Sequence, residues 1–507
     1  MDPHPTPQEA ISAAEESFER FRKNAGFFLA PAGFVATLWW TSGFLSPEAS
    51  RLSAVLVLMV AFWLTESIPL PVTALLGAVL NIVLGVADAR TVLTPFADPI
   101  IFIFIGGFML ARAMTRHGLD RRLALGVLSL PGVSRSPGRI LAAMGLVTAL
   151  VSMWVSNTAT TAIFLPIALG VLGSLFPGAN FRTHAYAAGM MLMLAYAASI
   201  GGIVTPVGSP PNLIAAGQLE KLAGVEIGFL TWVLLCLPIF AVMMVVLWTM
   251  LRILHPDDGN SRGPTGGLEA FLARQQAALG AWTPGQRSTA LAFAVAVTLW
   301  IVPGIAQAAL GKDHESVRFL NTHFPEAIVA LLAVSLLFFL PGGDGRRAMD
   351  WPDAVKIDWG IVLLFGGGLS LGSLMFSTGV ARVMGESAAA WFGAGSGLWT
   401  LTALAIAVGI LLSETTSNTS SATMLCPVII ALADGMNVSP VAPTLGASLG
   451  ASMGFMLPVS TPPNAIVYGS GLVPLTAMLR AGLLFDVLGF AVIWCGLRVM
   501  CPLLGLA

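Results

Sequence analysis

Hydrophobic positions recur along this chain in long runs that are separated by short polar segments. Most of these runs approach or exceed the roughly 20 residues that a helix needs to cross the hydrocarbon of a bilayer. We therefore predict an all-α polytopic membrane protein. The eleven predicted spanning helices lie at residues 27–45, 51–66, 71–86, 99–117, 184–220, 229–254, 287–310, 324–341, 360–378, 441–470 and 479–505.

Two further apolar segments carry a polar motif at their centre. Residues 138–174 contain VSNTATT at 155–161, and residues 397–433 contain TSNTSSA at 416–422. Each segment is either two crossings or one re-entrant hairpin. The choice does not change on which side of the membrane the later spans begin.

The two motif segments are copies of one unit. Asn157 matches Asn418 at an offset of 261 residues, and Ser152 matches Ser413 at the same offset. Five predicted crossings separate the start of one unit from the start of the other, and five is odd, so the second unit is upside down. Inverted repeats with interrupted helices are typical of secondary transporters.

Proline interrupts two of the predicted spans at corresponding places. The loop TPVGSPPNLI at 205–214 matches LPVSTPPNAI at 457–466, at an offset of 252 residues. Because proline breaks a helix, we predict broken helices at 184–220 and 441–470. Small polar residues in membrane helices often serve packing alone. Two motif copies in register, each followed by its own Pro-Pro-Asn loop, favour a functional site instead.

The polar segments divide the chain into two halves. We predict a cytoplasmic leader at 1–26, a first half at 27–254, a cytoplasmic linker at 255–286 and a second half at 287–507. Hydrophobic residues make up 56% of the sequence and charged residues only 10%, against about 25% charged in soluble domains. The net charge of -1 gives no basic surface for nucleic acid.

The placement of lysine and arginine predicts the orientation, because these residues gather on the cytoplasmic side. With the N-terminus inside, all but seven of the 25 lysines and arginines fall on interior segments. The C-terminus is then expected outside the cell. The seven exterior residues are Arg51, Arg90, Lys221, Lys312, Arg318, Arg382 and Arg498.

The chemistry of the motifs suits a charged solute. Unsatisfied polar groups in hydrocarbon cost several kcal/mol, so these motifs should line an enclosed cavity. Broken helices offer N–H groups to an anion and carbonyl, serine or asparagine oxygens to a hard cation. No lysine or arginine lies within either motif, and Glu414 is the one acid inside a copy. A bound dianion would therefore need co-bound cations, whereas a neutral substrate would not.

These motifs resemble those of the divalent anion/sodium symporter family, the INDY-type dicarboxylate carriers. The resemblance is carried by the paired Ser-Asn-Thr motifs and by the GSPPN and STPPN loops. The segments WLTESIPLPVTALL at 63–76 and DWGIVLLFGGGLSLG at 358–372 add to it. It implies a homodimer in which each protomer has eleven spans, two re-entrant hairpins, a scaffold domain and a transport domain that moves like an elevator.

The resemblance also implies site residues. The first sodium site would comprise Ser152, Ser156, Asn157 and Gly208. The second sodium site would comprise Ser413, Thr416, Asn418 and Ser460. The substrate carboxylates would meet Ser156, Asn157, Thr158, Ser417, Asn418, Thr419, Thr461 and Pro462, with Ser209 and Pro210 as the symmetric partner.

We therefore expect a carrier in the bacterial inner membrane, surrounded by lipid, that imports succinate, malate or fumarate with sodium ions and needs no organic cofactor. A sodium-independent dicarboxylate exchanger and a citrate or sulfate carrier remain alternatives. A channel would need a continuous pore lined by carbonyl or charge rings. An intramembrane enzyme would need a nucleophile with its base, or a metal triad, and no His, Lys or Cys lies within either motif.

Overall fold

A computed structural model describes residues 13–257, 266–392 and 397–506. The start of the expected leader and residues 258–265 of the expected linker lie outside this part of the chain. Nearly every described element is a helix, which confirms the predicted all-α class. One small antiparallel ribbon, β1 (Pro341–Gly343) paired with β2 (Arg346–Arg347), was not expected from the sequence.

The first half forms fourteen helical elements, three of them short 3-10 turns. They are α1 (Ala13–Thr41), α2 (Pro47–Thr65), α3 (Leu70–Val83), α4 (Ala89–Leu93), η1 (Thr94–Ala97), α5 (Pro99–Arg116), α6 (Leu119–Leu128), η2 (Val133–Arg135), α7 (Pro137–Ser152), α8 (Asn157–Leu175), η3 (Phe181–Thr183), α9 (Ala185–Gly202), α10 (Pro210–Ala223) and α11 (Phe229–Leu254).

The linker and the second half form twelve further helices. They are α12 (Gly266–Leu279), α13 (Pro284–Leu310), α14 (Glu315–His323), α15 (Glu326–Phe339), α16 (Trp351–Ala354), α17 (Trp359–Ser377), α18 (Val380–Phe392), α19 (Leu398–Thr415), α20 (Asn418–Gly435), α21 (Val441–Ala451), α22 (Pro462–Gly469) and α23 (Leu475–Leu503).

The number of membrane-length helices differs from the eleven expected. In the described part of the chain, nine helices are long and apolar enough to cross a membrane, or ten if the bent pair α14–α15 is one span. Helix α3 has only 14 residues, because it ends at Val83 and the left-handed Gly85 follows its end. Helix α1 begins inside the expected leader and runs without a break to Thr41.

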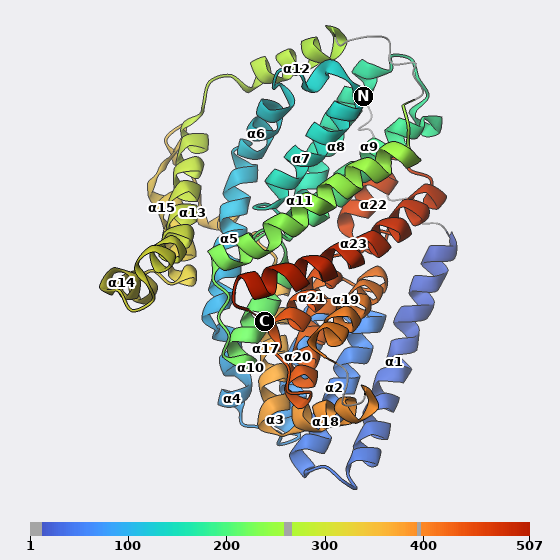
Figure 1. Cartoon of the computed structure of the whole chain (residues 1–507), viewed down its shortest axis with the longest axis vertical. Coiled ribbons are helices and arrows are strands. Elements are labelled where there is room, and N and C mark those ends of the chain that lie inside the picture. Colours follow the sequence, from blue (N-terminus) through green and yellow to red (C-terminus); the bar gives the residue numbers. More distant parts are fainter. Residues whose placement is uncertain (1–12, 258–265, 393–396, 507) are drawn as a thin grey trace.

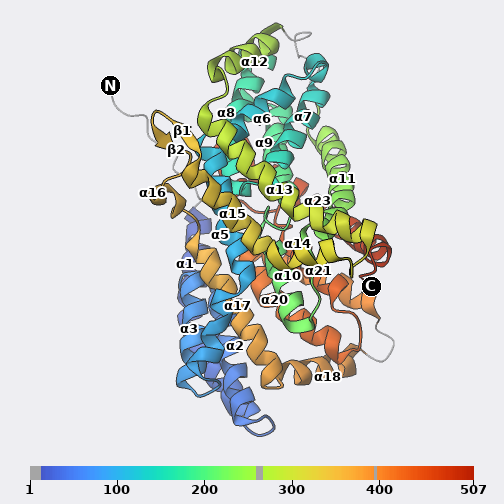
Figure 2. The same ribbon diagram turned by 90° about the vertical axis from the view of Figure 1, so that its left-hand side faces the viewer.

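Each Ser-Asn-Thr segment forms a pair of helices that turn back on each other at the motif. Helices α7 and α8 meet at residues 153–156, and α19 and α20 meet at residues 416–417. Figure 1 shows α7 and α8 in the upper half of the molecule and α19 and α20 in the lower half, and Figure 2 shows the same division. The two hairpins therefore approach the middle of the protein from opposite ends.

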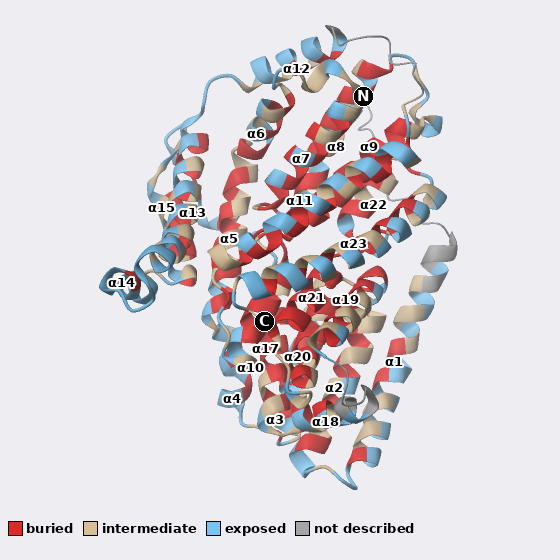
Figure 3. Cartoon of the chain, viewed as in Figure 1, coloured by how far each residue is buried: buried red, intermediate tan, exposed pale blue. Residues whose placement is uncertain are grey.

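The broken helices lie at the centre of the packing. In α9, 94% of the most apolar 18-residue stretch is buried inside the protein. In the outer helix α13 this share is 22%. Figure 3 shows buried residues filling α9, α20 and α21, with exposed residues along α11, α13 and α23. Since the exposed residues of these outer helices are largely apolar, their outward faces suit lipid contact. The interrupted elements are thus enclosed by protein, where irregular backbone can be tolerated in a membrane.

Candidate functional site

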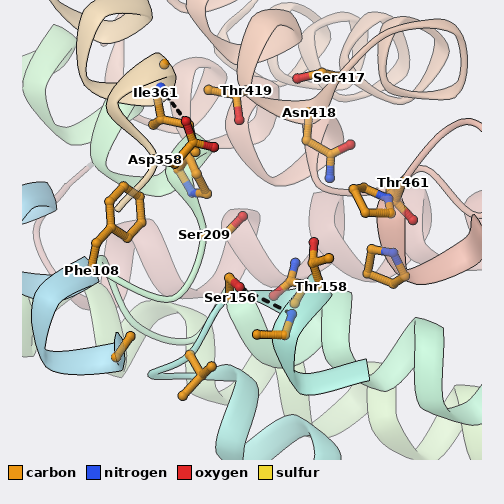
Figure 4. A pocket seen from close by; sticks show the side chains of 18 of the residues that line it. Phe108, Ser156, Thr158, Ser209, Asp358, Ile361, Ser417, Asn418, Thr419 and Thr461 are labelled. Carbon is orange, nitrogen blue, oxygen red and sulfur yellow. Dashed lines mark hydrogen bonds between the residues drawn. The ribbon is translucent and has the colours of Figure 1, made fainter. Parts of the chain in front are cut away.

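The tips of both hairpins and the breaks of both interrupted helices line one cavity of about 930 Å³. Figure 4 shows Ser156 and Thr158 on one side of it, facing Ser417, Asn418 and Thr419 on the other. Twelve residues expected at the site line this cavity. They are Ser156, Asn157, Thr158, Gly208, Ser209, Pro210, Ser417, Asn418, Thr419, Ser460, Thr461 and Pro462.

Local hydrogen bonds hold the first hairpin tip in shape. Helix α8 begins at Asn157, and the Ser156 hydroxyl caps it by accepting a hydrogen bond of 3.3 Å from the Ala159 N–H. The Ser152 hydroxyl at the end of α7 donates to Asn157 Oδ1 at 2.8 Å. The asparagine side chain is therefore oriented by the helix that precedes it.

The second tip repeats this arrangement. The Ser417 hydroxyl caps α20 by accepting from the Ser420 N–H at 3.4 Å, and the Ser413 hydroxyl donates to Asn418 Oδ1 at 2.8 Å. The repeat seen in the sequence is thus also a repeat of hydrogen bonds.

Three expected ion ligands lie behind the cavity rather than on its wall: Ser152, Ser413 and Thr416 are all buried. The hydroxyls of Ser152 and Ser413 donate hydrogen bonds to the side-chain oxygens of Asn157 and Asn418, respectively. The Thr416 hydroxyl is 2.9 Å from the Leu412 carbonyl and 2.8 Å from the Ser421 hydroxyl. Its side chain therefore faces the hairpin interior, because that is where its hydrogen-bond partners lie.

Two asparagines in the Pro-Pro-Asn loops fix the unwound segments, and they were not among the expected site residues. The Asn212 amide donates to the carbonyls of Gly202 and Thr205, each at 2.8 Å. The Asn464 amide donates to the carbonyls of Gly454 and Leu457, each at 3.0 Å. The shared Pro-Pro-Asn spacing is the signal in the sequence that could have identified these residues as clamps.

Several helices begin at the cavity, among them the four that follow the two hairpin tips and the two Pro-Pro breaks. The first residues of these four are Asn157 of α8, Pro210 of α10, Asn418 of α20 and Pro462 of α22, and all four line it. A helix N-terminus has unpaired N–H groups and a partial charge of roughly +0.5. At this generic value the four ends contribute roughly two positive charges without a charged side chain, which suits a dianion. Helices α10 and α22 each begin with Pro-Pro, so they present fewer N–H groups than α8 and α20.

The edge of the cavity does carry charged side chains, although the tips do not. Glu19, Glu66, Arg112, Lys356 and Asp358 line it. These residues come from α1, the end of α2, α5 and the segment before α17, so no local motif could indicate that they meet. The expectation of a site with almost no fixed charge therefore holds at the tips and not at the rim.

An ion-pair cluster joins two of these rim cations. Arg112 lies 3.7 Å from Asp353, and Lys356 donates to the same carboxylate at 2.8 Å. The hydrogen bond from Lys356, together with the charge of the nearby Arg116, holds the pKa of Asp353 below its ordinary value. This carboxylate thus stays ionised and partly neutralises Arg112 and Lys356.

Glu414 makes the two halves unequal. Its buried carboxylate accepts hydrogen bonds from the N–H groups of Phe455 and Met456, at 2.6 and 2.9 Å, and from the Ser460 hydroxyl at 2.7 Å. It therefore clamps the unwound segment between α21 and α22. The neighbouring carboxyl of Asp486 is also buried, and neither of its oxygens has a hydrogen-bond partner in the described part of the chain.

Comparison with known proteins adds independent information. The family model described as the sodium:sulfate symporter transmembrane region matches residues 28–505. The sodium-dependent dicarboxylate transporter SdcS of Staphylococcus saprophyticus is 32% identical over 487 residues, which covers 92% of this chain and 89% of that protein. An uncharacterized transporter of Haemophilus influenzae is 33% identical over 454 residues, which covers 88% of this chain and 91% of that protein.

Solved structures resemble the fold at low sequence identity. The YdaH transporter of Alcanivorax borkumensis is 14% identical with a TM-score of 0.56, over 82% of this chain and 88% of its own. MtrF of Neisseria gonorrhoeae is 14% identical with a TM-score of 0.52, over 91% of this chain and 97% of its own. At this identity the likeness concerns the arrangement of helices alone.

Proposed function

Since the chain belongs to the sodium:sulfate symporter family, whose model spans residues 28–505, we propose that it is a secondary transporter for dicarboxylates coupled to sodium. Its substrates are C4-dicarboxylates such as succinate, malate and fumarate. The sodium-dependent dicarboxylate transporter of Staphylococcus saprophyticus, 32% identical, supports this choice. The protein is therefore a carrier and not an enzyme.

The observation that carries the proposal is the meeting of four helix N-termini at one cavity. Their combined charge of about +2 matches a dicarboxylate with two ionised groups. Hydroxyl groups of both tips can donate to the carboxylate oxygens, and those of Thr158 and Thr419 both face the cavity (Figure 4). The cavity volume lies within the usual range of about 300–1,000 Å³ for small-molecule sites.

Sodium ions bind behind the tips in this proposal, on oxygen atoms of each half. In the first half Asn157 Oδ1 and Ser152 Oγ lie together, and Gly202 at the end of α9 packs against this oxygen, since a Cβ there would lie 2.6 Å from Asn157 Oδ1. In the second half Asn418 Oδ1 and Ser413 Oγ form the same pair. Thr416 would contribute its carbonyl, since its hydroxyl faces the hairpin interior between Leu412 and Ser421.

Alternating access follows from the two opposed hairpins. We propose that the hairpins and broken helices move together, in an elevator-like motion, against a scaffold that includes α1–α5, α13, α15 and α17. The protomer pairs with a second copy through this scaffold.

In the proposed orientation the N-terminus lies in the cytoplasm and the C-terminus lies outside. The hairpins are re-entrant from opposite sides of the plasma membrane.

Uptake of labelled succinate by proteoliposomes tests the proposal. We expect saturable uptake that requires an inward sodium gradient and is inhibited by malate and fumarate. Uptake that does not depend on sodium but requires succinate inside the proteoliposomes would show a dicarboxylate exchanger instead. Inhibition by sulfate or citrate, but not by malate, would identify another anion as the substrate, and flux without saturation would indicate a channel.

A further inference from the structure

The polar first turns of α1 reach the edge of the transport cavity. Glu19 lines the cavity, and Arg22, one turn further along, has a side chain only 18% exposed. Arg22 Nη1 donates to the carbonyl of Thr415 at 2.6 Å, and Nη2 pairs with the carboxylate of Glu66 at 3.2 Å. One guanidinium thus bridges two elements that are far apart in sequence.

The two partners of Arg22 belong to different parts of the molecule. Glu66 caps the end of α2, which packs along α1, and Gly26 lies directly against Thr65 and Ser67 there. Thr415 is the last residue of α19, immediately before the second hairpin tip. Arg22 therefore ties the α1–α2 pair to that tip.

The geometry of both partners favours a guanidinium at this point. The Thr415 carbonyl lies at the C-terminal end of α19, where carbonyl groups lack helical partners and a cation is stabilised. Glu66 adopts a left-handed conformation with φ of 50°, which is uncommon for a residue other than glycine. Its N–H bonds back to the Phe62 carbonyl, so the cap fixes the place from which its carboxylate reaches Arg22.

We propose that Arg22 is a conformational latch, which holds the second hairpin tip against α1 and α2 in the state seen here. The inference rests on the proposed transport function, because only an alternating-access cycle requires the tip to move away from α1. When the hairpin shifts, the bond to the Thr415 carbonyl breaks, while the ion pair with Glu66 remains within the α1–α2 pair. The latch thus sets how readily the cavity leaves this state.

Cysteine accessibility tests the latch without any substrate. Val459 lines the cavity and is 51% exposed in this state, so a Val459→Cys reporter is placed in a chain whose four native cysteines are replaced. We expect Arg22→Gln to slow thiol labelling of this reporter severalfold from the side on which the cavity opens. The control Lys23→Gln removes a neighbouring cation whose ion pair, among the described residues, is with Glu19 on its own helix, and it should leave labelling unchanged.

A charge swap tests the latch even if the single variant folds poorly. Arg22→Glu combined with Glu66→Arg rebuilds the cross-helix pair and places a guanidinium beside the same tip, so labelling should return toward the parent rate. Three results would overturn the latch. They are equal labelling rates in Arg22→Gln and its parent, an equal slowing of labelling in Lys23→Gln, and no recovery of the labelling rate in the charge swap. Because the readout needs no ligand, it is independent of whether succinate is the substrate.

Discussion

Asn157 and Asn418 each accept a hydrogen bond from a serine five residues earlier, and each begins a helix that points away from the cavity. A serine hydroxyl that donates to the asparagine still has lone pairs for a cation. The pair of residues therefore forms a preorganised cluster of oxygens in each half. This equivalence makes the two asparagines the most informative single residues for a test of function.

Replacing either asparagine should abolish transport without unfolding the protein. Asn157→Ala and Asn418→Ala each remove an oxygen at the proposed ion site, and neither residue is fully buried. We expect succinate uptake to fall at least tenfold, while size-exclusion elution stays that of the parent. Ser174→Ala, at the far end of α8, removes a hydroxyl that donates to the Gly170 carbonyl of the same helix and serves as the control. Loss of folding in the asparagine variants would favour a packing role.

Glu414 should matter first for stability. Glu414→Ala leaves the buried N–H of Phe455 and that of Met456 without an acceptor, and each unsatisfied group costs about 1–3 kcal/mol. We expect a marked fall in the melting temperature of the purified protein. Glu414→Gln retains one carbonyl oxygen for the two N–H groups, so its fall should be smaller. Equal melting temperatures for parent and Ala variant would show that the clamp does not hold the segment.

At the scale of elements, two patterns that repeat at fixed offsets located both motif segments and both broken helices, and the family resemblance implied that the motif segments form re-entrant hairpins. Those features are local, since serine caps and Pro-Pro breaks act within a few residues. Residues brought together from distant elements could not be predicted in this way. Arg22, Arg112 and Lys356 reach the site only because α1, α5 and the segment before α17 pack beside the hairpins.

The unwound segment between α9 and α10 depends on Gly208, because the neighbouring backbone leaves no space for a side chain there. A Cβ on Gly208 would lie 2.6 Å from the Gly202 carbonyl oxygen and 2.9 Å from that of Met153. Both neighbours are backbone atoms, which move less easily than the end of a flexible side chain. Gly208→Ala should therefore displace the unwound segment and lower both uptake and the melting temperature. Gly173→Ala is the matched control, because its Cβ meets nothing within 4 Å and alanine favours a helix by up to about 1 kcal/mol.

At the scale of the whole molecule, the two hairpins enter from opposite ends, as Figures 1 and 2 show, and the tips of both line one cavity. The sequence indicated this inversion through the odd number of crossings between its repeats. The number of spans was less predictable, because α3 is short, α14 and α15 bend by 61°, and α1 merges with the leader. Hydropathy reports apolar length and does not reveal where a helix bends.

The orientation of the chain is directly testable. In a chain without native cysteines, a cysteine at 506 should react with a membrane-impermeant thiol reagent added to intact cells. A cysteine at Glu269, in the polar helix α12, should react only after the cells are opened. The opposite pattern of labelling would overturn the orientation drawn from lysine and arginine placement.

The central claim is that four helix N-termini bind the dianion together with sodium ions, and calorimetric titration tests it most directly. Purified protein is titrated with succinate in sodium buffer and in choline buffer, and with sodium at low and saturating succinate. Linkage requires that sodium tighten succinate binding by the same factor as succinate tightens sodium binding. We predict a coupling of about 1–3 kcal/mol, or roughly 5- to 150-fold in affinity. Tight succinate binding in choline that added sodium does not change would contradict the account.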